Sequence, residues 1–164
     1  MKNWITELKK NWKSYLFWIL FTEVVGILAG FLTREGTKLY SDSIIKPPLS
    51  PPTLVFPIAW SILYALMGVG AARIRLSADS AERHRAMNLY IAQLIVNFFW
   101  SLIFFNAQAY GFALIWLLFL WLLIFWMIAA FRKADPKAAL LQIPYLLWVT
   151  FAGYLNFMIY QLNR

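Results

Sequence analysis

Five long apolar runs take up most of this 164-residue chain and dominate what it can fold into. A helix needs roughly 20 apolar residues to cross a hydrocarbon core about 30 Å thick, and each run is about that long. The runs lie at about residues 14–33, 56–74, 85–105, 111–131 and 138–162. We therefore expect an all-α integral membrane protein, with residues 1–164 forming a single domain built as a five-helix transmembrane bundle.

The composition excludes several classes of function. The chain is 62% hydrophobic and 13% charged, against about 45–50% and about 25% in soluble domains. It has no cysteine, which excludes thiol catalysis and thiolate metal sites. No Ser/His/Asp set, paired carboxylates or glycine-rich phosphate loop is present, and the single histidine, His84, is expected to be a solvated loop residue. We expect no metal site and no required cofactor, and enzymatic activity is uncertain.

The basic residues indicate an orientation in the membrane. Of the 15 Lys and Arg residues, 11 lie in the N-terminal segment and the second and fourth loops, and 4 lie on the opposite side. The positive-inside rule then predicts a multi-pass protein of the cell membrane, with its N-terminus in the cytoplasm and its C-terminus outside. The basic residues are not interleaved with exposed aromatic residues on a soluble face, so no nucleic-acid partner is expected.

The N-terminal residues 1–13 carry Trp and apolar side chains among lysines. An amphipathic helix on the inner membrane surface fits this pattern. A frayed continuation of the first transmembrane helix fits it as well.

Prolines mark the connection between the first two runs. Residues 34–55 form the longest connection between runs. Four of the chain's seven prolines lie in it, and a fifth, Pro57, lies at the start of the second run. A connection of this length and composition suggests a lid loop. We expect residues 46–52 to follow a stiff, extended path, and Pro57 to fit in the first turn of the second helix, where a missing donor costs least. The predicted lid residues are Lys46, Pro47, Pro51 and Pro52.

One face of the first run is unusual for a membrane helix. Glu23, Gly26 and Gly30 recur at helical spacing, and Glu23 is the only acid within a run. The two glycines allow close approach of another helix, a ligand or a second copy of the chain. Glu23 should face the interior or a wet cavity, where we expect it to be packed and hydrogen-bonded.

Three other faces combine aromatic rings with amides, and unmatched amides are costly against lipid, so these faces should converge. They would enclose either an ordinary core or a cavity suited to a flat, largely apolar ligand with polar edges. Their residues are Trp60, Tyr64, Met67 and Ala71; Gln93, Asn97, Trp100, Ser101 and Phe104; and Pro144, Trp148, Ala152 and Asn156.

The fourth run carries Trp116, Trp121 and Trp126. Steps of five residues rotate about 140° around a helix, so these rings should scatter over its surface and face lipid or the membrane interface. We expect this to be the outer or dimer-facing helix.

The end of the chain fits a weak pattern proposed for sterol contact. The pattern comprises Leu155, Tyr160 and Arg164. An interfacial tyrosine beside an anchoring arginine is the alternative interpretation.

Three motifs follow one another along the chain. The first joins Lys46-Pro47 and Pro51-Pro52 to Val55-Phe56-Pro57-x-x-Trp60-x-x-Leu63-Tyr64-x-x-Met67-Gly68. The second is Gln93-x3-Asn97-x-x-Trp100-Ser101-x-x-Phe104-Phe105, and the third is Pro144-Tyr145-Leu146-x-Trp148-x-x-Phe151-Ala152-x-x-Leu155-Asn156. Together they resemble the translocator protein (TspO/MBR) family, also known as tryptophan-rich sensory proteins or peripheral-type benzodiazepine receptors, over about residues 15–163.

The resemblance implies a five-helix bundle, commonly dimeric, whose pocket is covered by the first loop. It also implies binding of porphyrins, haem, sterols and benzodiazepine- or isoquinoline-type drugs, and a role as a tetrapyrrole sensor or translocator. Some bacterial members are linked to light-dependent porphyrin breakdown, for which the corresponding residues here are Trp60 and Trp148. The implied ligand-binding residues are Gly26, Gly30, Trp60, Tyr64, Asn97, Trp100, Trp148 and Ala152.

The chain departs from the family pattern at the start of the lid. The Trp-Tyr pair usual there is replaced by Tyr40 and Ser41, and the aromatic residue often found between the proline pairs is Leu49. Ligand preference is therefore expected to differ. The functional hypotheses are a ligand-binding sensor or translocator, a porphyrin-degrading enzyme, and a structural dimeric partner of other membrane proteins.

Overall fold

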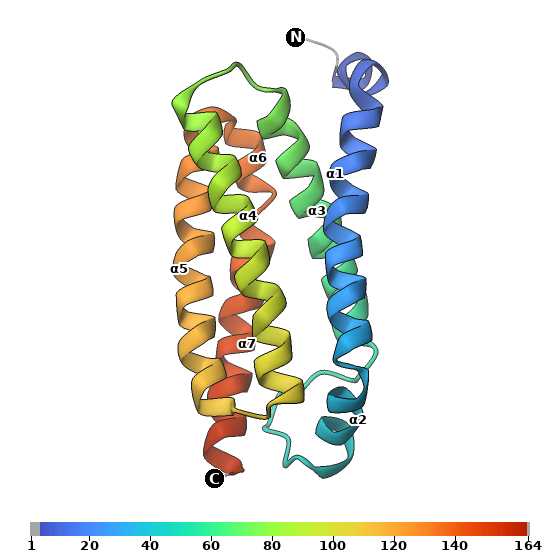
Figure 1. Cartoon of the computed structure of the whole chain (residues 1–164), viewed down its shortest axis with the longest axis vertical. Coiled ribbons are helices and arrows are strands. Elements are labelled where there is room, and N and C mark those ends of the chain that lie inside the picture. Colours follow the sequence, from blue (N-terminus) through green and yellow to red (C-terminus); the bar gives the residue numbers. More distant parts are fainter. Residues whose placement is uncertain (1–3, 164) are drawn as a thin grey trace.

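The computed structural model describes residues 4–163 and confirms an all-α bundle with five helices long and apolar enough to cross a membrane (Figure 1). The candidate spans are Lys9–Leu32, Val55–Leu76, Ala81–Asn106, Tyr110–Ala134 and Pro136–Leu162. In chain order the elements are α1 (Trp4–Leu32), α2 (Arg34–Ser43), α3 (Val55–Leu76), α4 (Ala81–Ser101), the π-helix η1 (Leu102–Asn106), α5 (Tyr110–Ala134), α6 (Pro136–Leu140) and α7 (Ile143–Leu162).

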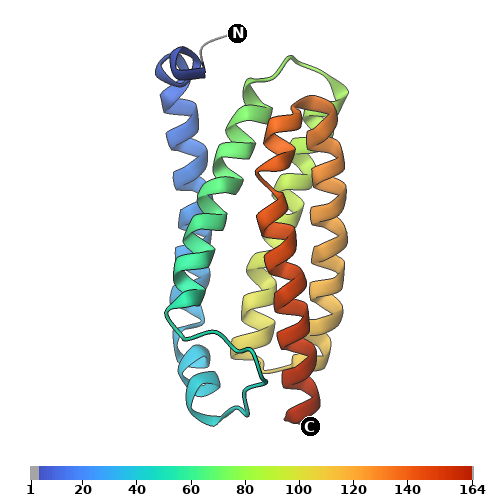
Figure 2. The ribbon, with the colours of Figure 1, turned by 180° about the vertical axis from the view of Figure 1, so that it is seen from behind.

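Helix α1 lies at the edge of the bundle. It packs chiefly on α3, whereas α5 packs against both α4 and α7 (Figures 1 and 2). Only 11% of the apolar window of α1 is buried, against 33% of that of α5. The first span, rather than the fourth, is therefore the most exposed, because α5 lies between two neighbours. A dimer contact through the fourth span stays a prediction.

The three tryptophans of α5 differ in how exposed their rings are, although their spacing predicts that all three face outward. The indole Nε1 of Trp116 donates a hydrogen bond to the carbonyl oxygen of Val96 at 2.8 Å, and that of Trp121 donates to Oγ1 of Thr150 at 2.9 Å. Both rings are half-buried, whereas Trp126 is 50% exposed. Only Trp126 therefore meets the expectation of an outward-facing ring, because the other two bond to adjacent helices.

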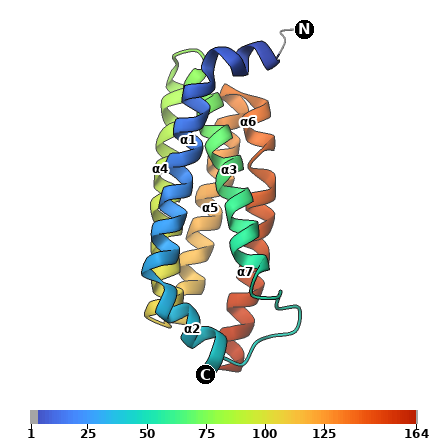
Figure 3. The ribbon, with the colours of Figure 1, turned by 90° about the vertical axis from the view of Figure 1, so that its right-hand side faces the viewer.

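A kink divides the first helix. Asn11 has non-helical backbone angles (φ −114°, ψ 15°), and the segment before it turns across the end of the bundle (Figure 3). Of the two interpretations of the N-terminal segment, this direction favours a surface helix over a straight continuation of the span.

The fifth span is broken at Leu141 and Gln142, between α6 and α7. Pro144 in the first turn of α7 has no N–H, and its ring would clash with the carbonyl four residues earlier. The carboxylate of Asp135 caps α6 and also forms an ion pair with the guanidinium of Arg73 in α3, at 2.7 Å. Pro144 itself is exposed, so it is not part of the inward face predicted for this span.

The loop between the first two spans contains a helix of its own. Residues 34–43 are helical as α2, so the irregular part of the predicted lid loop is confined to residues 44–54. This segment and the C-terminal end of α7 lie at the same end of the bundle, opposite the N-terminus (Figure 1). Pro57 lies in the first turn of α3, as predicted.

His84 lies at the other end, in the first turn of α4 rather than in a loop. Its side chain is 67% exposed, as expected, and its Nε2 lies 2.9 Å from Oδ1 of Asp79.

A close backbone contact holds α1 to α3. A Cβ added at Gly68 would lie 2.5 Å from the Cα of Ile19, a separation that real Cβ atoms do not show. We expect Gly68→Ala to destabilise the bundle by about 1–3 kcal/mol, because the two backbones would have to move apart. Thermal unfolding in detergent checks this.

Gly153→Ala is the matched control, since a Cβ there meets only Leu117 Cδ2 at 3.6 Å, an ordinary contact. Alanine is the better helix former, so the control should leave stability unchanged or raise it by up to about 1 kcal/mol. Equal melting of the two variants would contradict the close contact.

Candidate ligand-binding cavity

A cavity of about 610 Å³ lies between α1, α3, η1 and α7, under α2 and the loop that follows it. Seven of the eight predicted ligand-binding residues line it: Gly26, Gly30, Trp60, Tyr64, Trp100, Trp148 and Ala152. The three faces predicted to converge, from α3, α4 with η1, and α7, therefore meet at this end of the bundle, and α1 adds a fourth wall. Met67, Ala71 and Gln93 of those faces are fully buried and do not line the cavity.

Stacked rings on α3 form one wall. The rings of Trp60 and Tyr64, one turn apart, stack with centroids 5.4 Å apart and planes at 30°. Gly26 of α1 makes room for this wall, because a Cβ there would lie 2.3 Å from the Tyr64 ring. By contrast, a Cβ at Gly30 would meet nothing within 4 Å, so Gly30 faces open cavity space.

Trp148 supplies the second indole, from α7. Its ring meets Phe56 of α3 edge to face at a centroid distance of 6.1 Å, and both rings line the cavity. Together with Trp100 of α4, these rings give the cavity aromatic surface from three helices, which suits a flat apolar ligand.

The π-helix η1 completes the wall at the end of α4. Its wider turn, with Ala107 N–H bonded to Leu102 O at 3.1 Å, lets both Phe104 and Phe105 face the cavity. Phe104 also stacks on Trp100, with centroids 5.1 Å apart. The sequence predicts an uninterrupted helix here, so the lining role of Phe105 was missed.

Asn97 does not line the cavity, unlike its predicted partners. It is fully buried one turn deeper along α4, where its Nδ2 donates to the hydroxyl oxygen of Tyr145 at 2.8 Å. The Tyr145 hydroxyl in turn donates to Oε1 of Gln93 at 2.9 Å. Asn97 thus supports the cavity from below, because buried amides in a membrane bundle pair with other side chains where they can.

Asn156, rather than Asn97, is the amide side chain that lines the cavity wall. Its Nδ2 donates to the carbonyl oxygen of Tyr110 at 2.8 Å, and its Oδ1 accepts a 3.4 Å hydrogen bond from the Trp100 indole. It therefore orients the Trp100 ring. The four-residue step from Ala152 was the sequence signal for this position.

The charges are separated along the cavity. Arg34 and Lys46 line it near the lid, while Glu23 lies nine residues before the end of α1 at Leu32, about 14 Å deeper at helical rise. Within residues 4–163 Glu23 forms no hydrogen bond or ion pair, so the expected packed, hydrogen-bonded acid is not what the structure shows. Arg34 pairs with Glu35 at 3.4 Å, but both side chains are exposed and the pair is weak.

Helix α2 is seated on η1 through a glycine. A Cβ at Gly36 would lie 2.4 Å from the carbonyl oxygen of Phe105, so only glycine permits this contact. Asn106 Nδ2 adds a 3.0 Å hydrogen bond to the carbonyl oxygen of Leu32, where α1 ends. Tyr40 of α2 packs on Phe104 and Phe105, each at 5.6 Å, and this burial raises the pKa of its hydroxyl.

The loop after α2 is tied to α7 by one asparagine. Asn163 Oδ1 accepts from the Ile45 N–H at 3.0 Å, and its Nδ2 donates to the Ile45 carbonyl at 3.1 Å. The Tyr154 hydroxyl adds a 3.4 Å bond to the Pro48 carbonyl. We call the Asn163–Ile45 pair the lid latch. No sequence pattern pointed to it.

The proline segment is less extended than predicted. The carbonyl of Pro47 accepts from both the N–H and the hydroxyl of Ser50, and Leu49 between them has φ 70°. Proline followed by a positive φ is typical of a type II turn, in which leucine is strained and glycine favoured. Of the predicted lid residues, Lys46 and Pro51 line the cavity, whereas Pro47 is buried elsewhere and Pro52 is exposed.

Of the sterol-contact pattern, the two described residues, Leu155 and Tyr160, do not share a face of α7. Leu155 is buried in the cavity wall, while Tyr160 is five residues further along α7, with its ring beside Gly111 of α5. Arg164 lies outside the described residues.

Comparison with known proteins gives a consistent set of relatives. The sequence model of the TspO/MBR family matches residues 18–162. The chain is 36% identical to the tryptophan-rich protein TspO of Chlorobaculum tepidum over 140 residues, which cover 85% of this chain and 89% of the relative. It is 35% identical to the translocator protein of Bos taurus (93% and 92% covered) and 38% identical to the tryptophan-rich sensory protein of Cereibacter sphaeroides (74% and 75% covered).

The lid latch gives a test of how the cavity is closed. Asn163→Ala removes both bonds to Ile45, so we expect amide hydrogen exchange across residues 44–50 to become roughly tenfold faster, given about 0.5–1.5 kcal/mol per bond. Hydrogen-exchange mass spectrometry checks this. Gln161→Ala, an exposed position nearby, is the control; unchanged exchange in Asn163→Ala would show that the latch does not hold the loop.

Proposed function

Because this chain belongs to the TspO/MBR family, we propose that it binds flat amphipathic ligands in the aromatic cavity and acts as a tetrapyrrole sensor or translocator in the membrane. The observation that carries this proposal is the cavity of about 610 Å³ with an indole on each of three helices, Trp60 on α3, Trp100 on α4 and Trp148 on α7. That volume lies within the roughly 300–1,000 Å³ usual for small-molecule sites. No additional cofactor is required.

The charges of the cavity favour an acidic tetrapyrrole over a sterol. A porphyrin or haem presents a flat aromatic ring, which suits Trp60 and Trp148, and carboxylates at its edge, which suit Arg34 and Lys46. A sterol or a benzodiazepine- or isoquinoline-type drug would use the aromatic walls but leave the cations unused. These remain secondary ligands in the proposal.

Sensing and translocation both require that the ligand reach the cavity. The lid between α2 and α3 is held to α7 by the lid latch and the Tyr154 bond, a small number of neutral hydrogen bonds. Neutral bonds of this kind contribute about 0.5–1.5 kcal/mol each, so opening is accessible at ordinary temperature. The names of the relatives cover both roles, as sensory protein and as translocator protein.

Location and assembly are part of the same proposal. We infer a multi-pass protein of the cell membrane, in contact with lipid, with the N-terminus cytoplasmic and the C-terminus outside, from the 11 to 4 distribution of Lys and Arg. A homodimer would form through lipid-facing helix surface. The face of Gly26 and Gly30 is not available for it, because both glycines line the cavity. The cavity itself also argues against a purely structural partner.

Light-dependent breakdown of bound porphyrin is the second candidate function. It is favoured by the cavity-lining indole of Trp60 stacked on Tyr64, since both rings can donate an electron to a photoexcited ligand beside them. The reaction would need dioxygen as oxidant. Porphyrin absorbance that is stable under aerobic illumination of the saturated protein would exclude it.

Removing the indole of Trp60 or of Trp148 should weaken porphyrin binding. We expect Trp60→Ala and Trp148→Ala each to raise the Kd for protoporphyrin by about 2- to 12-fold, because a ring contact is worth about 0.5–1.5 kcal/mol. Titration of intrinsic fluorescence in detergent measures this. Trp12→Ala, which removes a 54% exposed indole outside the cavity, is the control. Identical Kd values in all variants would remove the cavity assignment.

Arg34 and Lys46 should pair with the carboxylates of an acidic ligand. We expect Arg34→Gln combined with Lys46→Gln to weaken protoporphyrin binding by about 10-fold or more, because two charge-assisted contacts are lost. Binding of protoporphyrin dimethyl ester, which has the same ring but no carboxylates, should be nearly unchanged in the same variant. Equal loss for acid and ester would contradict a carboxylate contact.

A further inference from the structure

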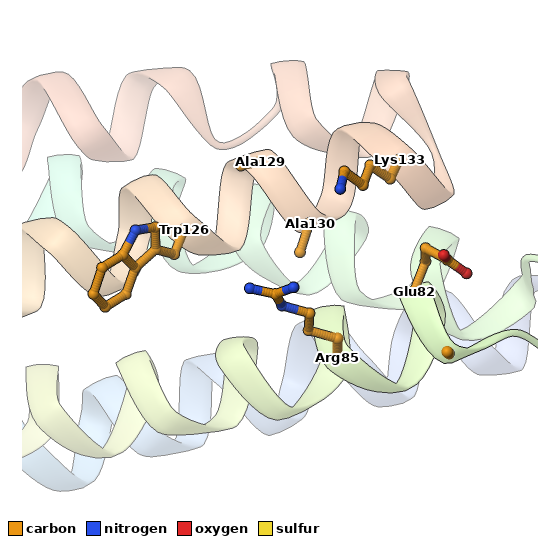
Figure 4. A pocket seen from close by; sticks show the side chains of 7 residues that line it. Glu82, Arg85, Trp126, Ala129, Ala130 and Lys133 are labelled. Atoms are coloured by element: carbon orange, nitrogen blue, oxygen red, sulfur yellow. The ribbon is translucent and has the colours of Figure 1, made fainter.

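A second, smaller hollow lies far from the aromatic cavity, between the start of α4 and the end of α5. This groove has a volume of about 220 Å³ and is drawn in Figure 4. Its floor is made of small side chains, which leave the space open. Its residues are Ala81, Glu82, Arg85, Trp126, Ala129, Ala130 and Lys133.

Two cations are directed over the groove. The guanidinium of Arg85 reaches from α4 toward α5 beside Ala130, and the Lys133 side chain lies on the α5 side of the same space (Figure 4). Both side chains are exposed, and within residues 4–163 neither forms a salt bridge. The only acid in the lining, Glu82, lies at the end of the groove away from Trp126. The groove therefore has a net positive charge and no internal partner for its cations.

The other end of the groove joins an apolar surface. Trp126, 50% exposed, lies seven residues before Lys133, about 10 Å toward the middle of α5. Beyond it the outward face of α5 carries Leu118, Leu122 and Phe125, all at least 44% exposed. A half-exposed tryptophan between cations and an apolar helix face is the arrangement found at the depth of lipid head groups.

The unpaired cations and the adjoining apolar face together suit a ligand with an anionic head and an apolar tail. A free phosphate would use only the cations, and a neutral lipid would leave them unpaired. We propose that the groove binds an anionic phospholipid, whose phosphate pairs with Arg85 and Lys133 while one acyl chain follows Trp126 and the outward face of α5. On the predicted orientation this lipid belongs to the cytoplasmic leaflet. The site is separate from the aromatic cavity and does not depend on its ligand.

The test is native mass spectrometry of the full-length protein in mild detergent, titrated with phosphatidylglycerol or phosphatidylcholine. We expect tighter retention of phosphatidylglycerol by the wild type, and weakening of about tenfold or more in Arg85→Gln combined with Lys133→Gln, from about fivefold per cation. The control is Arg75→Gln combined with Lys137→Gln, two exposed cations at the same end but outside the groove. It removes the same charge and should change binding less than about twofold.

Two further measurements keep the proposal testable if the double variant folds poorly. Glu82→Gln removes the one opposing charge and should tighten phosphatidylglycerol binding by about twofold or more. Phosphatidylglycerol with brominated acyl chains should quench the fluorescence contributed by Trp126, taken as wild type minus Trp126→Phe, more than brominated phosphatidylcholine does.

Three outcomes would overturn the proposal. Equal retention of the two lipids would show that there is no charge-selective site. Equal loss in the groove variant and its control would show non-specific attraction by a basic surface. Displacement of the lipid by an equal concentration of inorganic phosphate would show a site for free phosphate, without an acyl chain contact.

Discussion

Hydrocarbon offers no hydrogen-bonding partners, so polar groups inside this bundle must satisfy one another. Thr22, Gln93, Asn97 and Asn156 are all fully buried, and each bonds across or between helices. The Thr22 and Tyr90 hydroxyls join α1 to α4, and the Gln93–Tyr145–Asn97 chain joins α4 to α7. These bonds determine which helix faces meet, and therefore where the space that remains unfilled can lie.

The regular packing of long α-helices ends where the cavity begins. At this end the α4 ladder widens into η1, α2 folds over the opening, and residues 44–54 have no regular structure. Irregular backbone near membrane depth is tolerated where it is buried in protein or lines a cavity, and η1 does both. Asn156 joins the two regions, because it bonds both the start of α5 and the indole of Trp100. The cavity is thus framed by the same polar network that stabilises the bundle.

Local patterns in the sequence were sufficient for most of the architecture. Apolar run lengths predict the five spans, and four-residue steps place Trp60 with Tyr64 and Trp148 with Ala152, because these are properties of a single helix. Features that depend on distant partners were not predictable. A buried amide such as Asn97 fits a cavity wall or a network equally well until its partner is known. The lid latch joins residues 118 positions apart, and no periodicity records that contact.

Gly30 has a consequence for how such a cavity can diverge between related proteins. At most positions in a packed bundle a larger side chain lowers the stability of the fold, because the added carbon displaces a neighbouring atom. At Gly30 an added Cβ meets nothing within 4 Å, so it would occupy open space in the cavity. The shape of the cavity at this position can therefore change in a single mutational step without compensating changes elsewhere, a path along which the proposed selectivity can drift while the fold stays constant.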